Sequence, residues 1–227
     1  MATPFQERPV RQAFTAELEQ LRLQVELMGV RVDQNLERTR EVLRTGDVGL
    51  ARVTVEADDL IDAMNVSLTE RCYDLMSRES PVAGDLRFVV SVLRVLSELE
   101  RIGDLALRVV KLAPDWELLR RHPATFDILL SMADTAVEQY RTALRAWSAQ
   151  DLGLAAELAD HRPMEAFTER FSRELLGIDG PDAVLAAVRT LVAGRSLDRI
   201  ADHAAIIGAR IRYMVTGDPA HLTAEIR

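Results

Sequence analysis

The feature that most constrains the fold is an apolar spacing of three and four residues that runs through long segments of the chain. In the first segment the spacing is formed by Phe14, Leu18, Leu21, Val25, Met28, Val32 and Leu36. It places apolar side chains on one stripe of an α-helix, in a seam close to that of a coiled coil. This helix is expected to end near Gly46, since glycine readily stops a helix.

The same period continues between Gly and Pro breaks, and no segment has the strict alternation of a strand. A second helix is expected to turn inward Leu50, Val53, Ala57, Leu60, Met64, Leu68 and Leu75. Four more are expected over Val82–Ala113, Ala124–Ala149, Leu152–Leu176 and Pro181–Thr216. The sequence therefore predicts an all-α protein.

The predicted helices fall into two matching halves. Asp47-Val-Gly-Leu-Ala after the first helix matches Asp151-Leu-Gly-Leu-Ala after the fourth. Each half is an up-down-up unit, and a tandem duplication explains the match. We expect two tandem three-helix bundles of long antiparallel helices, with domains at 1–115 and 116–227.

An acidic pair recurs in both halves. Glu100-Arg-Ile-Gly-Asp104 in the third helix is matched by Asp198-Arg-Ile-Ala-Asp202 in the sixth. Residues four apart stack on one helical face, where two like charges cost about a few tenths of a kcal/mol. The helical period places the first pair at the margin of the buried face. The repetition of an unfavourable pair calls for an explanation.

Two explanations stay open. Arg101 and Arg108 could neutralise Glu100 and Asp104 in surface salt bridges. Alternatively, a hard or borderline cation could bridge the carboxylates and turn their repulsion into attraction.

A second pair precedes the first in each half. Asp58 and Asp62 are four apart in the second helix, and the matching places in the fifth carry His161 and Glu165. If these helices are antiparallel neighbours, two pairs converge in each half. Such oxygen-rich sets, one of them with an imidazole, suit Fe, Zn, Mn or Mg.

Composition narrows the class of function. The net charge of −8 argues against nucleic acid as the main partner, because phosphate binding needs clustered positive charge. The only cysteine, Cys72, shares the spacing of Leu68 and Leu75 and is expected to be a core thiol in a reducing compartment. The N-terminus resembles no signal peptide, and no segment approaches the roughly 20 apolar residues of a membrane span. A cytoplasmic location is expected, with membrane contact only through partners.

Several phrases of the sequence resemble the PhoU family of phosphate-signalling regulators. The doubled family signature is matched by ELERIGDLALRV and SLDRIADHAAIIGARIRYMVTG. The likeness extends from Phe14 to Gly217 through FTAELEQLRLQVELMG, RVTVEADDLIDAMN and SPVAGDLRFVVSVLRVLSELERIGD. The resemblance implies a fold of two three-helix bundles and no catalytic activity.

The resemblance also implies a function. It implies a negative regulator of phosphate uptake and of the phosphate-starvation response. Its partners would be the ATPase subunit of the Pst phosphate ABC transporter and a sensor histidine kinase, and a homodimer is a further expected assembly.

The acidic motifs of the family are associated with metal clusters, often of iron or zinc. Carried over to this sequence, the metal-binding set is Asp58, Asp62, Glu100, Asp104, His161, Glu165, Asp198 and Asp202. The second half departs from the pattern, because a histidine and a glutamate replace aspartates and Pro163 between them bends a helix. In addition, Gly103 becomes Ala201. The first half therefore matches the metal-site pattern better.

Three other classes of function stay open. A helical-bundle metalloenzyme of the di-iron type would use Glu-x-x-His pairs, and no glutamate here has a histidine three residues later. His203 beside Asp202 could accept a phosphoryl group, although a metal-side or surface histidine explains it equally. The third class is a purely structural scaffold with solvated acids.

Overall fold

The computed structural model describes residues 4–79, 81–160 and 162–226, and within these every regular element is a helix. The longer helices are α1 (Pro4–Thr45), α2 (Val48–Glu79), α3 (Ala83–Val110), α5 (Pro123–Ala149), α6 (Leu152–Asp160), α7 (Glu165–Leu176) and α8 (Ala183–Thr216). The shorter ones are η1 (Ala113–Asp115), α4 (Trp116–Arg120) and η2 (Pro219–Ile226). In the part of the chain so described, no helix combines the length and apolar content that crossing a membrane requires.

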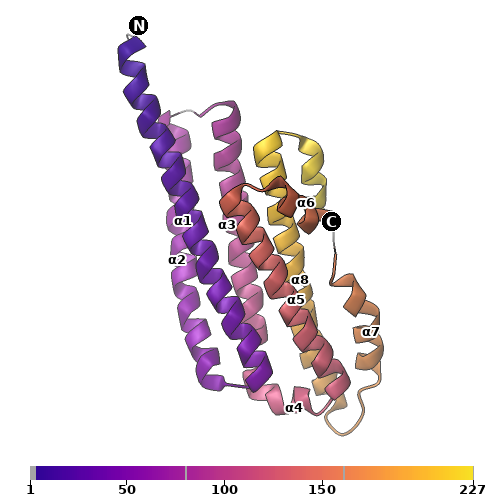
Figure 1. Ribbon diagram of the computed structural model, residues 1–227. Coiled ribbons are helices and arrows are strands. Elements are labelled where there is room, and N and C mark those ends of the chain that lie inside the picture. Colours follow the sequence, from indigo (N-terminus) through magenta and orange to yellow (C-terminus); the bar gives the residue numbers. More distant parts are fainter. Residues whose placement is uncertain (1–3, 80, 161, 227) are drawn as a thin grey trace.

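The helices form two bundles that lie side by side (Figure 1). In the first bundle α1, α2 and α3 pack on one another, and consecutive helices run in opposite directions. In the second, α5 and α8 pack together and are covered by α6 and α7. The bundles meet where α3 packs along α8 and α1 along α5. The predicted all-α fold of paired bundles is confirmed.

Matching aspartates begin the second helix of each bundle. Oδ1 of Asp47 accepts a hydrogen bond from the backbone N–H of Leu50, at 2.9 Å. Oδ1 of Asp151 accepts from the N–H groups of Gly153, at 2.7 Å, and Leu154, at 3.1 Å. These bonds satisfy N–H groups that have no partner inside a helix. The duplicated sequence phrase is thus a duplicated helix start.

The prediction of one helix over Leu152–Leu176 is wrong. The structure ends α6 at Asp160 and begins α7 at Glu165. Pro163 lies between them, and a proline removes a backbone hydrogen bond and clashes with the preceding turn. Instead of the expected bend, the result is two shorter helices.

One aromatic ring attaches α7 to the bundle. Phe171 is the only buried residue of α7, a helix that the structure describes throughout. Its ring lies against Gly194 of α8, where an added Cβ would stand 2.4 Å from Cε1 and Cζ. The absence of a side chain at Gly194 therefore makes room for this contact.

The core follows the predicted stripe on α1, whereas on α2 it includes the predicted Leu68 and Leu75 but not every residue that was expected inside. Val53 and Leu60, expected inside, are 45% and 46% exposed. The buried stripe of α2 runs instead through Thr54, Asp58 and Ile61. This shift places a carboxyl group on the inward side of a helix that otherwise buries apolar residues.

Cys72 is buried, as predicted for a core thiol. Burial raises the pKa of its thiol to about 12. The protonated thiol is therefore the stable form near neutral pH, and an inert, packed sulfur fits the core role.

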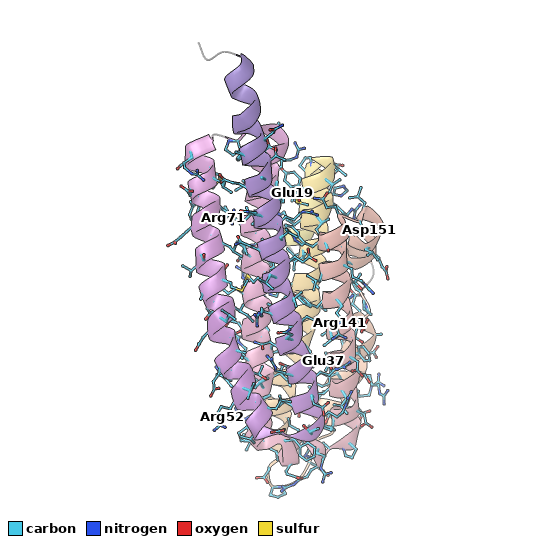
Figure 2. The ribbon with its side chains drawn as sticks, turned by 60° about the vertical axis from the view of Figure 1, so that its left-hand side comes forward. Glu19, Glu37, Arg52, Arg71, Arg141 and Asp151 are labelled. Atoms are coloured by element: carbon cyan, nitrogen blue, oxygen red, sulfur yellow. The ribbon has the colours of Figure 1, made fainter. Side chains whose placement is uncertain are left out.

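Two kinds of polar contact join α1 to α5. The hydroxyl of Tyr140, which is buried, donates to the backbone carbonyl of Gly29 at 2.6 Å. Beside it, the guanidinium of Arg141 donates to Asp33 at 2.9 Å and to Glu37 at 2.8 Å. Figure 2 shows Glu37 and Arg141 together on this side of the molecule.

Candidate functional site

The first acidic site lies where α2 packs on α3. Asp58 is 6% exposed, and its Oδ1 has no hydrogen-bond partner among the described residues. Burial raises the pKa of Asp58 to about 6, and repulsion from Asp62 and Asp104 adds to the increase. Lys111 opposes the shift but does not cancel it. The structure therefore brings Asp58, Asp62 and Asp104 into one electrostatic neighbourhood.

A glycine on α3 makes room for Asp58. A Cβ added at Gly103 would stand 3.0 Å from Oδ1 of Asp58, closer than ordinary packing allows. The carboxylate thus lies against the backbone of α3, one residue before Asp104. This close approach explains why a glycine interrupts the signature at this place.

Glu100 completes the first set at the rim. Its side chain is half-buried, whereas Asp104 and Asp62 are exposed, which confirms the predicted position at the margin of the buried face. The amide of Asn65 donates to Oε2 of Glu100 at 2.8 Å. Sequence patterning had not identified Asn65, which lies on α2 three residues beyond Asp62.

Arginine neutralisation does not account for the first site. Arg101 pairs instead with Glu98, at 3.5 Å, on the inward side of α3. Within the described ranges, Arg108 forms no ion pair, and no arginine or lysine pairs with Asp58, Asp62, Glu100 or Asp104. The salt-bridge explanation is therefore wrong for this half.

The second acidic site lies in a cavity between α5, α7 and α8. Asp198, Asp202 and Glu165 line this space of about 260 Å³ together with Arg162 and Arg195. Burial raises the pKa of Asp198, and repulsion from Asp202 contributes. Glu165 reaches the cavity from the first turn of α7, and not from the expected shared face of one long helix.

Both helix-α8 acids of this second site are paired with arginines. Nη1 of Arg195 lies 2.8 Å from Oδ2 of Asp198, and Nη1 of Arg162 lies 3.8 Å from Oδ1 of Asp202. His161, predicted as a further member, lies outside the described residues. In the second half arginines do neutralise the acids, but through Arg162 and Arg195, which the sequence analysis had not considered for this role.

The side chains of the first site are of a type that binds cations, but they are not arranged around one point. Across residues 4–79, 81–160 and 162–226, no three His, Cys, Asp or Glu side chains converge closely enough to hold a metal ion. Burial raises the pKa of Asp58 and repulsion from Asp62 and Asp104 adds to the increase, so the charged forms of these acids disfavour one another in the absence of a cation. The buried, unpartnered oxygen of Asp58 is the feature that a cation would satisfy.

A buried hydrogen-bonded pair that the sequence did not predict joins the two bundles. Glu98 of α3 is fully buried, and Oε2 of its carboxylate shares a hydrogen bond with Nδ1 of His203 on α8. Oε1 of Glu98 lies 3.0 Å from Nη2 of Arg94. His203 is thus neither a surface histidine nor an exposed phosphoacceptor. Its place among buried Ile200 and Ala204, on one face of α8, is the signal that could have revealed it.

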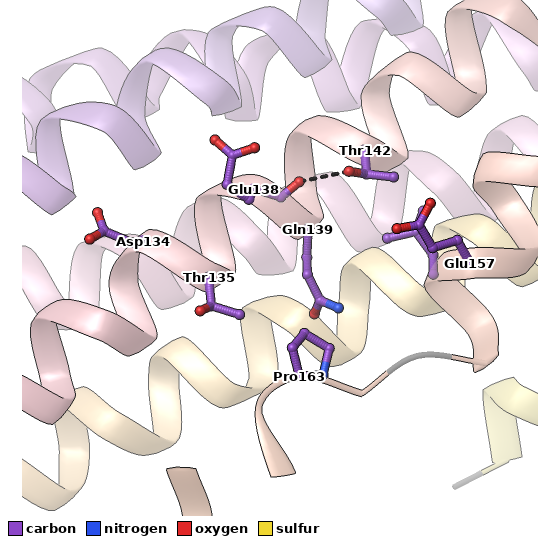
Figure 3. Close-up of a pocket in the computed structure, with 8 residues that line it drawn as sticks. Asp134, Thr135, Glu138, Gln139, Thr142, Glu157 and Pro163 are labelled. Carbon is purple, nitrogen blue, oxygen red and sulfur yellow. Dashed lines mark hydrogen bonds between the residues drawn. The ribbon is translucent and has the colours of Figure 1, made fainter. Parts of the chain in front are cut away.

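Another cavity, of about 350 Å³, contains none of the predicted residues (Figure 3). It lies between α5, α6 and Pro163, and its carboxylates are those of Asp134, Glu138 and Glu157. Asp134 pairs with Arg40 at 3.3 Å, so part of its charge is compensated.

Comparison with known proteins settles the family. The model of the PhoU domain matches the chain twice, over residues 25–113 and 129–211. The chain belongs to the PhoU family. This is a family of phosphate-transport accessory proteins and not of enzymes.

Individual PhoU proteins are similar over nearly their whole length. The chain is 30% identical to the phosphate-specific transport system accessory protein PhoU of Edwardsiella tarda, over 90% of this chain and 85% of that protein. Identity to the Escherichia coli K12 protein of that name is 28%, over 90% and 86% of the two chains. The crystal structure of PhoU from Pseudomonas aeruginosa matches with a TM-score of 0.84 and 30% identity, over 90% of this chain and all of that one.

Proposed function

We propose that this chain is a negative regulator of phosphate uptake and of the phosphate-starvation response, acting in the cytoplasm. It would link the ATPase subunit of a phosphate ABC transporter to a sensor histidine kinase. The observation that carries this proposal is the match of the PhoU model to both halves of the chain. The names of the relatives, accessory proteins of phosphate-specific transport, support the same role.

Deletion of the gene tests the regulatory role. Phosphate-starvation genes are expected to be expressed at high phosphate in the deletion strain, and the wild-type gene is expected to restore repression. Normal repression in a strain without any second gene of this family would contradict the proposal.

The partner assignments require a separate test. Each partner, the ATPase subunit and the kinase, is expected to co-purify with the tagged full chain. Separately expressed segments 1–115 and 116–227 would test the proposed domain division, and light scattering of the full chain would test a homodimer. Failure of both partners to co-purify, together with normal repression in the deletion strain, would reject the linking role.

We propose further that the first bundle binds a transition-metal ion, iron or zinc before manganese or magnesium. Asp58, Asp62, Glu100 and Asp104 would hold it. Support comes from the unpartnered oxygen of Asp58 and from the repulsion of Asp58 by Asp62 and Asp104, which Lys111 offsets only in part. A bound cation would neutralise carboxylates that otherwise repel one another.

Metal content tests this site. Purified wild-type protein is expected to retain or take up metal, as measured by mass spectrometry of the elements. The paired substitution Glu100→Ala and Asp104→Ala is expected to reduce the bound metal at least tenfold. Unchanged metal content in that variant would remove both residues from the ligand set.

A further inference from the structure

The two acidic sites differ in the cations that the protein itself supplies. In the first bundle, the described residues place no arginine or lysine in an ion pair with Asp58, Asp62, Glu100 or Asp104. In the second, arginines pair with both Asp198 and Asp202. The difference lies in the surroundings of the repeated signature, because its own acids are conserved between the halves of this chain.

Two substitutions between the halves produce the difference. Aligning Glu100 with Asp198 places Arg195 opposite Ser97, whose hydroxyl carries no charge. Aligning Asp62 with Glu165 places Arg162 opposite Asp59, so that a base replaces an acid. Arg195 adds one positive charge to the second site and the replacement at Arg162 adds two.

The effect on the neighbouring carboxylates is opposite in sign. Asp59 raises the pKa of Asp58 in the first site, in addition to the larger effect of burial. In the second site, Arg195 and Arg162 both lower the pKa of Asp198 against the larger effect of burial. In the first site Lys111 opposes the acids without forming an ion pair among the described residues, whereas the second site contains two arginines paired with its acids.

A guanidinium and a metal ion compete for the same carboxylate oxygens. Arg195 occupies Oδ2 of Asp198 at 2.8 Å, a distance typical of a charge-assisted hydrogen bond. A metal ion entering this cavity would have to displace that bond and to approach two fixed positive charges. Both effects weaken metal binding at Asp198 and Asp202.

We propose that, in the second bundle, the guanidinium groups of Arg162 and Arg195 take the place of a metal ion, so that this chain binds metal in its first bundle only. The inference rests on the metal site proposed above. It assigns Asp198 and Asp202 to an internal ion-pair network, although their spacing repeats that of Glu100 and Asp104. The cavity they line thus contains an arginine for each of these two aspartates.

Zinc titration of the full-length protein tests the proposal. Binding is followed by isothermal calorimetry and by element analysis after gel filtration. The substitutions Asp198→Ala and Asp202→Ala are expected to leave zinc binding within twofold of the wild type. The substitutions Asp58→Ala and Asp104→Ala are expected to abolish it. Loss of zinc from the Asp198/Asp202 variant would overturn the inference while leaving the first site intact.

A second variant tests whether removing the two arginines creates zinc binding in the second bundle. Arg162→Asp with Arg195→Ser introduces the residues found at the two matching positions of the first bundle and is expected to bind more zinc than the wild type. Arg173→Ser, which removes an exposed arginine of α7 outside the cavity, is the matched control. No gain in the Arg162/Arg195 variant would overturn the role of the guanidinium groups. A gain by this variant alone, with no zinc in the wild type, would support that role and reject the proposed first site. Circular dichroism melting confirms that each variant is folded.

Discussion

Glu98 and His203 share a buried hydrogen bond that connects α3 to α8, and thereby one bundle to the other. The two residues are 105 positions apart in the sequence. Removing one member of a buried ionic group leaves the others without compensation, which typically costs about 3 to 5 kcal/mol.

Glu98→Ala is therefore expected to lower the free energy of unfolding by about 3 kcal/mol. Glu98→Gln, which keeps a hydrogen-bond acceptor, is expected to cost less. Urea denaturation measures both, and Glu100→Ala, two residues along at the half-buried rim, is the control. Equal losses for the substitutions at 98 and 100 would contradict a structural role for the buried pair.

Asp58 predicts a pH dependence of stability in metal-free buffer. Its pKa is about 6 in the folded protein against 3.8 for an ordinary aspartate, so between these values the folded state binds more protons. The free energy of unfolding is therefore expected to fall as the pH rises from about 4 to about 6, and to stay lower above that range.

Asp58→Asn is expected to remove this fall and to stabilise the protein at pH 8 by about 1 kcal/mol, after allowance for solvent screening. Melting temperatures measured across the pH range in the presence of a chelator provide the test. A parallel pH profile for wild type and variant would show that Asp58 is not the responsible group. Asp127→Asn, at an exposed position of α5 outside the site, is the matched control.

The contacts between α1 and α5 predict two different responses to salt. Tyr140→Phe removes a buried hydrogen bond and is expected to cost about 1 kcal/mol at any ionic strength. Arg141→Met removes partly exposed ion pairs with Asp33 and Glu37, so its cost is expected to be below about 1 kcal/mol and to shrink in 1 M salt. Denaturation at low and high salt separates the two, and a salt-sensitive cost for Tyr140→Phe would count against this division.

The burial of Phe171 indicates that this side chain holds α7 against the second bundle. Phe171→Ala is expected to release α7 and to increase the rate of trypsin cleavage at Arg170 and Arg173 by about tenfold or more, because a buried Phe→Ala change typically costs about 3 to 5 kcal/mol. The melting temperature of the remaining bundle is expected to change less. Phe167→Ala, at a half-buried position of the same helix, is the control. Unchanged cleavage in the Phe171 variant would show that other contacts hold α7.

Periodicity was sufficient to predict the helices wherever the apolar stripe is unambiguous. On α1 the stripe from Leu21 to Leu36 is buried as expected. On α2 two stripes compete, and the one through Val53 and Leu60 is exposed. The tertiary packing of α3 selects the other stripe, and this choice is what buries Asp58.

The sequence indicated which acids of the first bundle lie near one another, but not the charges that surround them. The helical period of about 3.6 residues and the antiparallel packing of neighbouring helices were enough to predict that Asp58 lies near Asp104. Spacing could not show that Arg101 turns inward to Glu98 whereas Arg195 stays with Asp198, since the direction of a long side chain depends on the local packing. The buried Glu98–His203 pair was missed because it depends on the register of α3 against α8.

The contact of Asp58 with Gly103 has a consequence for how the two halves of this chain can diverge. A side chain gained at position 103 would press on the buried carboxylate of Asp58, so position 103 is restricted as long as Asp58 is kept. In the second half, where the acid is replaced by His161, the corresponding glycine has become Ala201. Substitutions at these two places are thus coupled: the loss of the acid removes the need for a glycine, and an alanine gained at position 103 would disfavour an aspartate at position 58.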